Sequence, residues 1–208
     1  ERKMLSANKA ADAIRDFNKA LNEFGKTDSE KECERIRRFE IFAGEHFPEK
    51  AKKYMVDGGF FRQTASTHYH SAHFGGLADH SHAVAEALLE FTRKMGLVWE
   101  NERSPYLVGY LHDICKMDEY ILKEVDGAMV YEFNKDRLLI GHGDKSAIIA
   151  AMLIPDLTDE EMLCIRYHHG AFEYSKDAWN AYGHAIEKYQ NVLYTHTADM
   201  TASRIKRV

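Results

Sequence analysis

The stretch GYLHDICK, residues 109–116, places a histidine and an aspartate side by side among apolar residues. Its apolar neighbours have the character of a buried helix face, so His112 and Asp113 are expected to lie in or beside the core. Burying an ionisable side chain is costly unless that side chain is paired or binds a metal ion. The pair therefore raises the question of which partners compensate its burial.

Other histidines and carboxylates follow along the chain in an order that would allow one shared site. The chain contains 12 histidines, and any one of them is more often an ordinary core or surface residue than a ligand. A shared metal centre would explain several of them together, and imidazole with carboxylate suits Fe, Mn, Zn or Ni better than Mg or Ca. The candidate metal ligands are His80, His112, Asp113, His142, His168, His169 and Asp199.

The elements that must position these residues are predicted to be helices, with at most one small β-hairpin. Apolar residues at helical spacing predict a helix over residues 75–96, in which His80 lies on the buried face. A proline in the first turn favours a second helix over residues 104–116. An Asp-Gly turn between β-prone flanks predicts the hairpin, over residues 121–133.

Three more helices are predicted towards the end of the chain. The first covers residues 144–153. The second begins at a capping box formed by Thr158 and Glu161. The third covers about 183–207 and carries Asp199 on an apolar stripe.

The N-terminal part of the chain is predicted to be a helical cover without a chemical motif. Ser29 and Glu32 form a possible capping box for the second of its helices. We assign residues 1–57 to this cover and 58–208 to the metal-binding core of the same domain. The predicted helices of the cover are 4–24, 29–43 and 48–55.

Bulk composition limits the possible classes of protein. A chain of 208 residues with 45% apolar residues predicts one domain with a sizeable core. The net charge of -5 argues against a broad nucleic-acid clamp. Three widely spaced cysteines argue against a disulfide framework and favour a reducing compartment, so we expect a cytoplasmic protein. No apolar run approaches the ~20 residues that span a bilayer, so no membrane partner is expected.

The order His, His-Asp, His, His-His, Asp resembles that of the HD superfamily of metal-dependent hydrolases, whose core is an all-helical bundle. The likeness covers roughly residues 69–203. The stretch HFGGLADHSHAV is similar to the GGLxEH(T/S) opening of bacterial HD-domain 3′→5′ exoribonucleases, with Asp79 in the place of the glutamate. LHDICK is similar to the HD-x-x-K segment of the family, and TADMTAS is similar to its closing helix.

The resemblance implies a binuclear centre with two divalent transition-metal ions, Fe or Mn being favoured and Ni, Zn, Co or Mg being possible. It implies that Asp113 and Lys116 act in catalysis, with Lys116 one helical turn beyond Asp113 and able to steady a phosphate or the leaving group; the alternative for Lys116 is an exposed lysine at a helix end. Asp113 could bridge both ions, because a carboxylate has two oxygens to share. The core ligands would be His80, His112, Asp113 and Asp199, and the additional histidines of the binuclear subclass would be His142, His168 and His169.

The implied activity is hydrolysis of a phosphoester, on a nucleotide or a short single-stranded nucleic-acid end, by metal-activated water. His70, His73 and Arg62 precede the metal helix and are candidates for substrate binding. The Gly-Tyr-Pro signature of cyclic-dinucleotide phosphodiesterases is missing, since YHHGAFE stands in its place. Two alternatives remain open at this stage: a di-iron oxygenase of the HD fold, and a nucleotide-binding regulatory module. The oligomeric state is also open.

Overall fold

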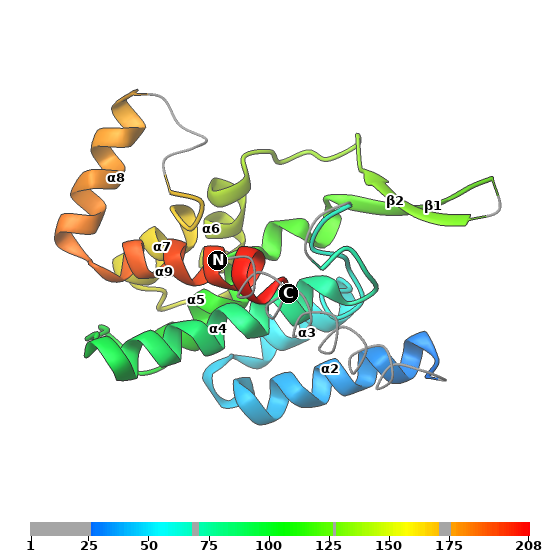
Figure 1. Cartoon of the computed structure of the whole chain (residues 1–208), viewed down its shortest axis with the longest axis horizontal. Helices are drawn as coiled ribbons and strands as arrows, with labels where there is room; N and C mark the ends of the chain where they lie inside the picture. The colour runs from blue at the N-terminus through cyan, green and yellow to red at the C-terminus, as the bar shows by residue number, and fades with distance from the viewer. Residues whose placement is uncertain (1–25, 68–70, 127, 171–175) are drawn as a thin grey trace, which may run out of the picture.

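Short helices and one hairpin make up the fold, as Figure 1 shows. The computed structural model describes residues 26–67, 71–126, 128–170 and 176–208. In chain order the elements are α2 (Asp28–Phe42), η1 (Gly44–His46), α3 (Glu49–Asp57), α4 (Gly76–Met95), α5 (Ser104–Leu111), η2 (Ile114–Asp118), β1 (Tyr120–Val125), β2 (Ala128–Phe133), α6 (His142–Leu153), α7 (Asp159–Arg166), α8 (Lys176–Lys188), α9 (Asn191–Met200) and η3 (Thr201–Lys206).

The predicted class, all-α with one small hairpin, is confirmed. Strands β1 and β2 form an antiparallel pair that projects from one side of the helical body (Figure 1). Their register runs from Tyr120 opposite Phe133 to Val125 opposite Ala128, and Asp126 has a positive φ of 52° at the turn. Within the described ranges, no helix is both long and apolar enough to cross a membrane.

Capping residues set several of the helix starts. The capping box of α7, formed by Thr158 and Glu161, is confirmed. The predicted box at residues 29 and 32 is wrong, because Thr27 is extended and its hydroxyl accepts the backbone N–H of Glu30, which starts α2 two residues earlier. The helix predicted over residues 4–24 lies outside the described residues.

The last predicted helix, over residues 183–207, is wrong as a single element. Helix α8 ends at Lys188 and α9 begins at Asn191, whose side-chain amide donates to the carbonyl of Val98 and to Glu160, each at 2.8 Å. These partners, which are distant in sequence, fix the break between α8 and α9. The local spacing of apolar residues carries no information about them. After Met200 the chain continues as the π-helix η3.

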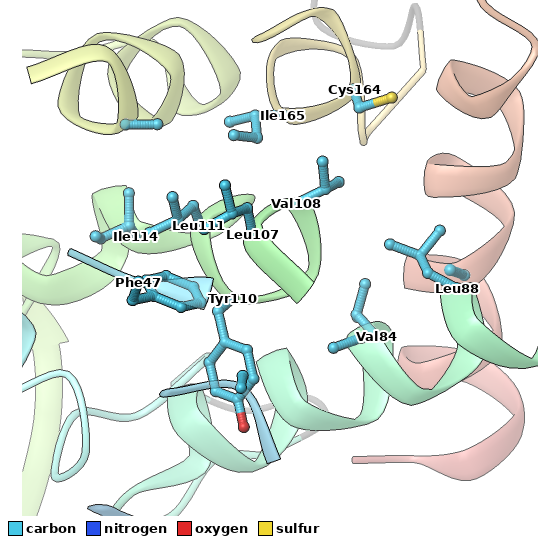
Figure 2. Packing of buried hydrophobic residues seen from close by; sticks show 14 of the residues in the cluster. Phe47, Val84, Leu88, Leu107, Val108, Tyr110, Leu111, Ile114, Cys164 and Ile165 are labelled. Atoms are coloured by element: carbon cyan, nitrogen blue, oxygen red, sulfur yellow. The ribbon is translucent and has the colours of Figure 1, made fainter. Parts of the chain in front are cut away.

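The core is built around α5, which lies between α4 on one side and α7 on the other (Figure 2). The side chains of Leu107, Val108 and Leu111 in α5 are fully buried. Helices α4 and α5 approach closely because Gly109 has no side chain: an added Cβ would lie 2.5 Å from the Cα and Cβ of Ala85. The described part of the predicted cover contributes to the same core, since Phe39 packs against Tyr110 with ring centroids 4.9 Å apart.

Helix α2 is attached to α4 by a buried ion pair at Asp79. The carboxylate of Asp79 accepts from Nη2 of Arg35 at 2.9 Å and from Nη2 of Arg38 at 2.6 Å. Burial alone would raise the pKa of Asp79, but the two guanidinium groups outweigh it and hold the pKa below its usual 3.8. Asp79, which stands where the GGLxEH pattern has glutamate, therefore connects α4 to α2.

We expect Gly109→Ala to destabilise the protein by about 1–3 kcal/mol, because the new methyl group must push α4 and α5 apart. Gly183→Ala is the matched control: it also adds a methyl group to a helical glycine, but nothing lies within 4 Å of that position. It should stabilise by up to roughly 1 kcal/mol through helix propensity. Urea unfolding measures both, and equal effects would contradict the close approach.

Asp79→Asn should destabilise by about 3–5 kcal/mol at neutral pH, because it leaves a buried guanidinium uncompensated. A carboxylate whose pKa is lower in the folded than in the unfolded state stabilises the protein at pH values above the unfolded-state pKa. That stabilisation is lost as the pH falls through the folded-state pKa. The difference from the wild type should therefore shrink below about pH 4. Asp156→Asn, at an exposed partner of Arg103, is the control and should change the free energy of unfolding little.

Candidate metal centre

All seven predicted metal ligands converge on one centre, although they come from five separate parts of the chain. We call these residues the His/Asp cluster: His80 from α4, His112 and Asp113 from the junction of α5 and η2, His142 from the start of α6, His168 and His169 after α7, and Asp199 from α9. Four of its members, His80, His112, Asp113 and His168, are exposed by 1% or less. Such burial requires internal compensation of charge and polarity.

Asp113 is the hub of the cluster, because each of its oxygens faces a different set of groups. Oδ1 lies 2.6 Å from Nε2 of His142 and 3.4 Å from Nε2 of His168. Oδ2 lies 2.7 Å from Nζ of Lys116, 3.5 Å from Nε2 of His112 and 3.6 Å from Nε2 of His80. One carboxylate thus joins two groups of imidazoles.

A break in the helix lets consecutive residues point at the same centre. The helix predicted over residues 104–116 is wrong in its second half: α5 ends at Leu111, and Asp113 has φ -108° and ψ 13°, outside the helical region. Neighbouring residues in an unbroken α-helix point about 100° apart. The break and the tighter 3₁₀ segment η2 turn His112 and Asp113 inwards together, and place Lys116 one turn beyond Asp113.

The outer ring nitrogens of the buried histidines are tied to backbone carbonyls. Nδ1 of His80 lies 2.8 Å from the carbonyl of Val208, and Nδ1 of His112 lies 2.8 Å from that of Gly109. Nδ1 of His168 lies 2.6 Å from the carbonyl of Ile165. A carbonyl can only accept, so each Nδ1 carries its proton and donates. The other ring nitrogen, Nε2, then faces the centre in each of the three residues.

His168 supplies the observation that most strongly favours a cation in this place. Burial lowers its pKa to about 3, so the ring is neutral, and its Nε2 is a buried atom without a hydrogen-bond partner among the described residues. That lone pair faces Oδ1 of Asp113, another acceptor. Nε2 of His80 and Nε2 of His112 lie 3.2 Å apart at the same centre. A metal ion between His168 and Asp113 would stabilise the two acceptors that face one another, so the donor set fits a metal.

The carboxylates of the cluster are held ionised. Burial opposes the charge of Asp113, but the charge of Lys116 and the neighbouring His112 and His142 outweigh it and keep its pKa well below the usual range. Burial likewise opposes the charge of Asp199, and His80 at 3.1 Å lowers its pKa strongly. Ionised carboxylates are the form that binds metal ions.

Two sets of donor atoms can each hold an ion. One set comprises Asp113, His142, His168 and His169, and the other comprises His80, His112 and Asp113; within each set the atoms lie within 4.8 Å of one another. Asp199 lies beside the second set through His80. The cluster therefore offers two donor sets that share one carboxylate.

A third donor set, which the sequence analysis missed, surrounds the other nitrogen of His142. Nδ1 of His142 lies 3.1 Å from Sγ of Cys115 and 3.8 Å from Oε2 of Glu119. Cys115 is buried and free, as a core thiol would be, but its sulfur contacts a predicted ligand. Glu119 follows Lys116 at the spacing of one helical turn, which was the available signal.

A pocket of about 570 Å³ opens onto the cluster. The hairpin contributes Tyr120 and Phe133 to its wall, and η3 contributes Ser203 and Arg204; none of these four was predicted. His196 also lines the pocket, and its Nδ1 lies 2.8 Å from the carbonyl of His168. The other lining residues are Ala65, Ser66, Lys116, Glu119, His142, His169, Asp199 and Met200.

The residues predicted to bind substrate lie elsewhere or outside the described part. Arg62 pairs with Glu32 at 3.1 Å and lines a different, smaller pocket. His73 lies 3.8 Å from Asp79 and beside the carbonyl of Phe74. Neither residue lines the pocket at the cluster, and His70 lies outside the described residues. Substrate contacts in this pocket would come from the hairpin and η3 instead.

Comparisons with protein-family models, with curated proteins and with solved structures found no match to this chain.

Metal-stripped protein titrated with Mn²⁺ should bind about two ions per chain, one for each donor set around Asp113. Its free energy of unfolding should rise by about 2.7 kcal/mol at a hundredfold excess over the dissociation constant. Asp113 raises the pKa of His142 well above its usual value against the effect of burial, so binding there displaces a proton and should strengthen as pH rises. Calorimetric titration at several pH values measures these effects.

His169→Asn should lose one of the two ions. The side chain of His169 is partly exposed, so the variant should keep its fold. His184→Asn, at an exposed histidine on α8, is the matched control and should bind as the wild type does. Equal stoichiometry in the two variants would contradict the assignment of His169.

Proposed function

We propose that this chain is a metal-dependent phosphohydrolase or phosphodiesterase of the HD superfamily, acting on the phosphoester of a nucleotide or oligonucleotide. The observation that carries the proposal is the position of Asp113 between two sets of imidazoles, with the neutral Nε2 of His168 aimed at its oxygen. The order of the ligands along the chain, and the motifs around His80 and Asp199, support the same family.

The two donor sets would hold two divalent ions, with Fe or Mn favoured and Ni, Zn, Co or Mg able to replace them. Asp113 would belong to both sets, and Asp199 would join the set that contains His80. When bound, such ions supply positive charge for phosphoryl oxygens and an activated water as nucleophile.

Lys116 has a positioning role towards the hub and lies on the pocket wall. Burial disfavours its charge, but Asp113 raises its pKa, so the ammonium group stays protonated at neutral pH. Its bond of 2.7 Å to Oδ2 holds the carboxylate ionised and fixes its orientation. An ammonium group has three donors, so Lys116 can also donate to a phosphoryl oxygen in the pocket.

The aromatic residues of the pocket wall favour a substrate that contains a planar aromatic group. Phe133 is 52% exposed although it lines the pocket, and its ring packs against Tyr120 with centroids 5.1 Å apart. Stacking of a base on an aromatic side chain is worth roughly 1–3 kcal/mol. The pocket volume of about 570 Å³ suits a ligand of small-molecule size. These features favour a nucleotide over a simple phosphate ester.

The test is hydrolysis of bis(p-nitrophenyl) phosphate, nucleoside monophosphates and a short oligonucleotide, with Mn²⁺, Fe²⁺, Ni²⁺ and Mg²⁺ supplied separately. Activity should require added metal and be highest with Mn²⁺ or Fe²⁺. Asp113→Asn should lower kcat/KM by at least about a hundredfold, more than the loss of an outer partner of a metal ligand costs.

Asp136→Asn, in the exposed segment after the hairpin, is the control and should retain full activity. Full activity in metal-free protein would contradict the proposal. Consumption of oxygen by iron-loaded protein, without hydrolysis of any of these esters, would favour the di-iron oxygenase instead.

A further inference from the structure

Arg204 is an uncommitted cation on the wall of the pocket at the His/Asp cluster. Its side chain is exposed, and it has neither an ion pair nor a side-chain hydrogen bond among the described residues. Lys116, which also lines the wall, is already bonded to Asp113 at 2.7 Å. Of the lysine and arginine side chains that line this pocket, Arg204 is therefore the one with all its donors available to a ligand.

Helix α9 and its π-helical continuation η3 bring Arg204 to the pocket side. In an α-helix, with 3.6 residues per turn, the residue five positions after Asp199 would lie about 140° away from it around the axis. A π-helix has i→i+5 hydrogen bonds, so its turn holds more residues and the fifth residue returns towards the same face. Asp199, Met200, Ser203 and Arg204 accordingly all line the same pocket. Single π-helical turns are rare and frequently occur at functional sites.

Carboxylates line the same wall as Arg204. Asp199 and Glu119 both belong to the pocket lining. They would repel the anionic oxygens of a substrate, so a cation that faces the pocket would favour its binding. A guanidinium group has a planar fork of donors that matches two phosphoryl oxygens at once.

We propose that Arg204 binds anionic oxygens of the substrate phosphate beside the His/Asp cluster and is a substrate-binding residue of the site. This inference rests on the proposed phosphoesterase function. It assigns to Arg204 a contact with the phosphate beyond any from Lys116, whose ammonium group already donates to Asp113 at 2.7 Å.

The experiment compares the wild type with Arg204→Ala, Arg204→Lys and Lys206→Ala, all loaded with Mn²⁺. Lys206 is a matched control because it is a cation on the same π-helix that does not line the pocket. Affinity for adenosine 5′-monophosphate is measured by calorimetric titration at low and high salt, and Mn²⁺ content is measured for every variant. Steady-state hydrolysis of the preferred ester gives kcat and KM separately.

Arg204→Ala should weaken nucleotide binding by roughly tenfold to a hundredfold, the effect of losing hydrogen bonds to a charged group. Mn²⁺ content should not change, KM should rise more than kcat falls, and the salt dependence of binding should decrease. Arg204→Lys should recover part of the affinity, because it restores the charge without the fork of donors. Lys206→Ala should bind as the wild type does.

Unchanged nucleotide affinity in Arg204→Ala would overturn the inference, as would an equal loss in Lys206→Ala. The proposed function fails separately: if wild-type protein binds the nucleotide and hydrolyses no ester, that function is wrong, and the affinity of Arg204→Ala still decides the inference. If the wild-type protein binds Mn²⁺ but no nucleotide, both the inference about Arg204 and the proposal of a nucleotide substrate are wrong.

Discussion

The buried carboxylate of Asp113 is the constraint around which the site is organised. Asp113 is only 1% exposed, so the charge of its carboxylate must be compensated inside the protein. Lys116 and the surrounding imidazoles provide that compensation. The imidazoles are in turn oriented by backbone carbonyls, which bond their outer nitrogens and leave the inner ones facing the carboxylate. The carbonyls restrain the imidazole rings, and the rings together with Lys116 restrain the carboxylate. The donor atoms are therefore held in place before any ion binds.

Neighbouring residues of α4 serve opposite sides of the fold. His80 faces the cluster, whereas Asp79, one position earlier, points to α2 and accepts from two guanidinium groups. Consecutive residues on a helix point about 100° apart, so one turn can serve both a site and a packing contact. The close approach of α4 and α5 at Gly109 sets the distance across which His80 and His112 meet.

The residues of the candidate site lie where regular secondary structure stops or changes. Asp113 lies at the break between α5 and η2, His142 is the first residue of α6, and His168 follows the end of α7. Arg204 lies in a π-helical segment that continues α9. Such departures from local regularity are expected at functional sites, because they aim side chains that an unbroken helix would direct elsewhere.

The sequence by itself determined the helical class, the hairpin and the candidate ligands. These depend on local signals: apolar spacing, an Asp-Gly turn, a capping box, and His and Asp residues placed among apolar neighbours. The order of the ligands also suggested a family, and that remains a proposal supported by the geometry of the cluster.

Only the tertiary structure decided which residues surround the pocket. It placed Phe133 and Arg204 on the wall, left Arg62 and His73 away from it, and directed Lys116 at Asp113. The break after Leu111 and the one before Asn191 were likewise hidden from periodicity. The physical reason is that the partners of these residues lie far away in sequence, as Val98 and Glu160 do for Asn191. Local patterns report which face of an element is apolar, whereas the packing of distant segments decides where a helix breaks and what its polar side chains meet.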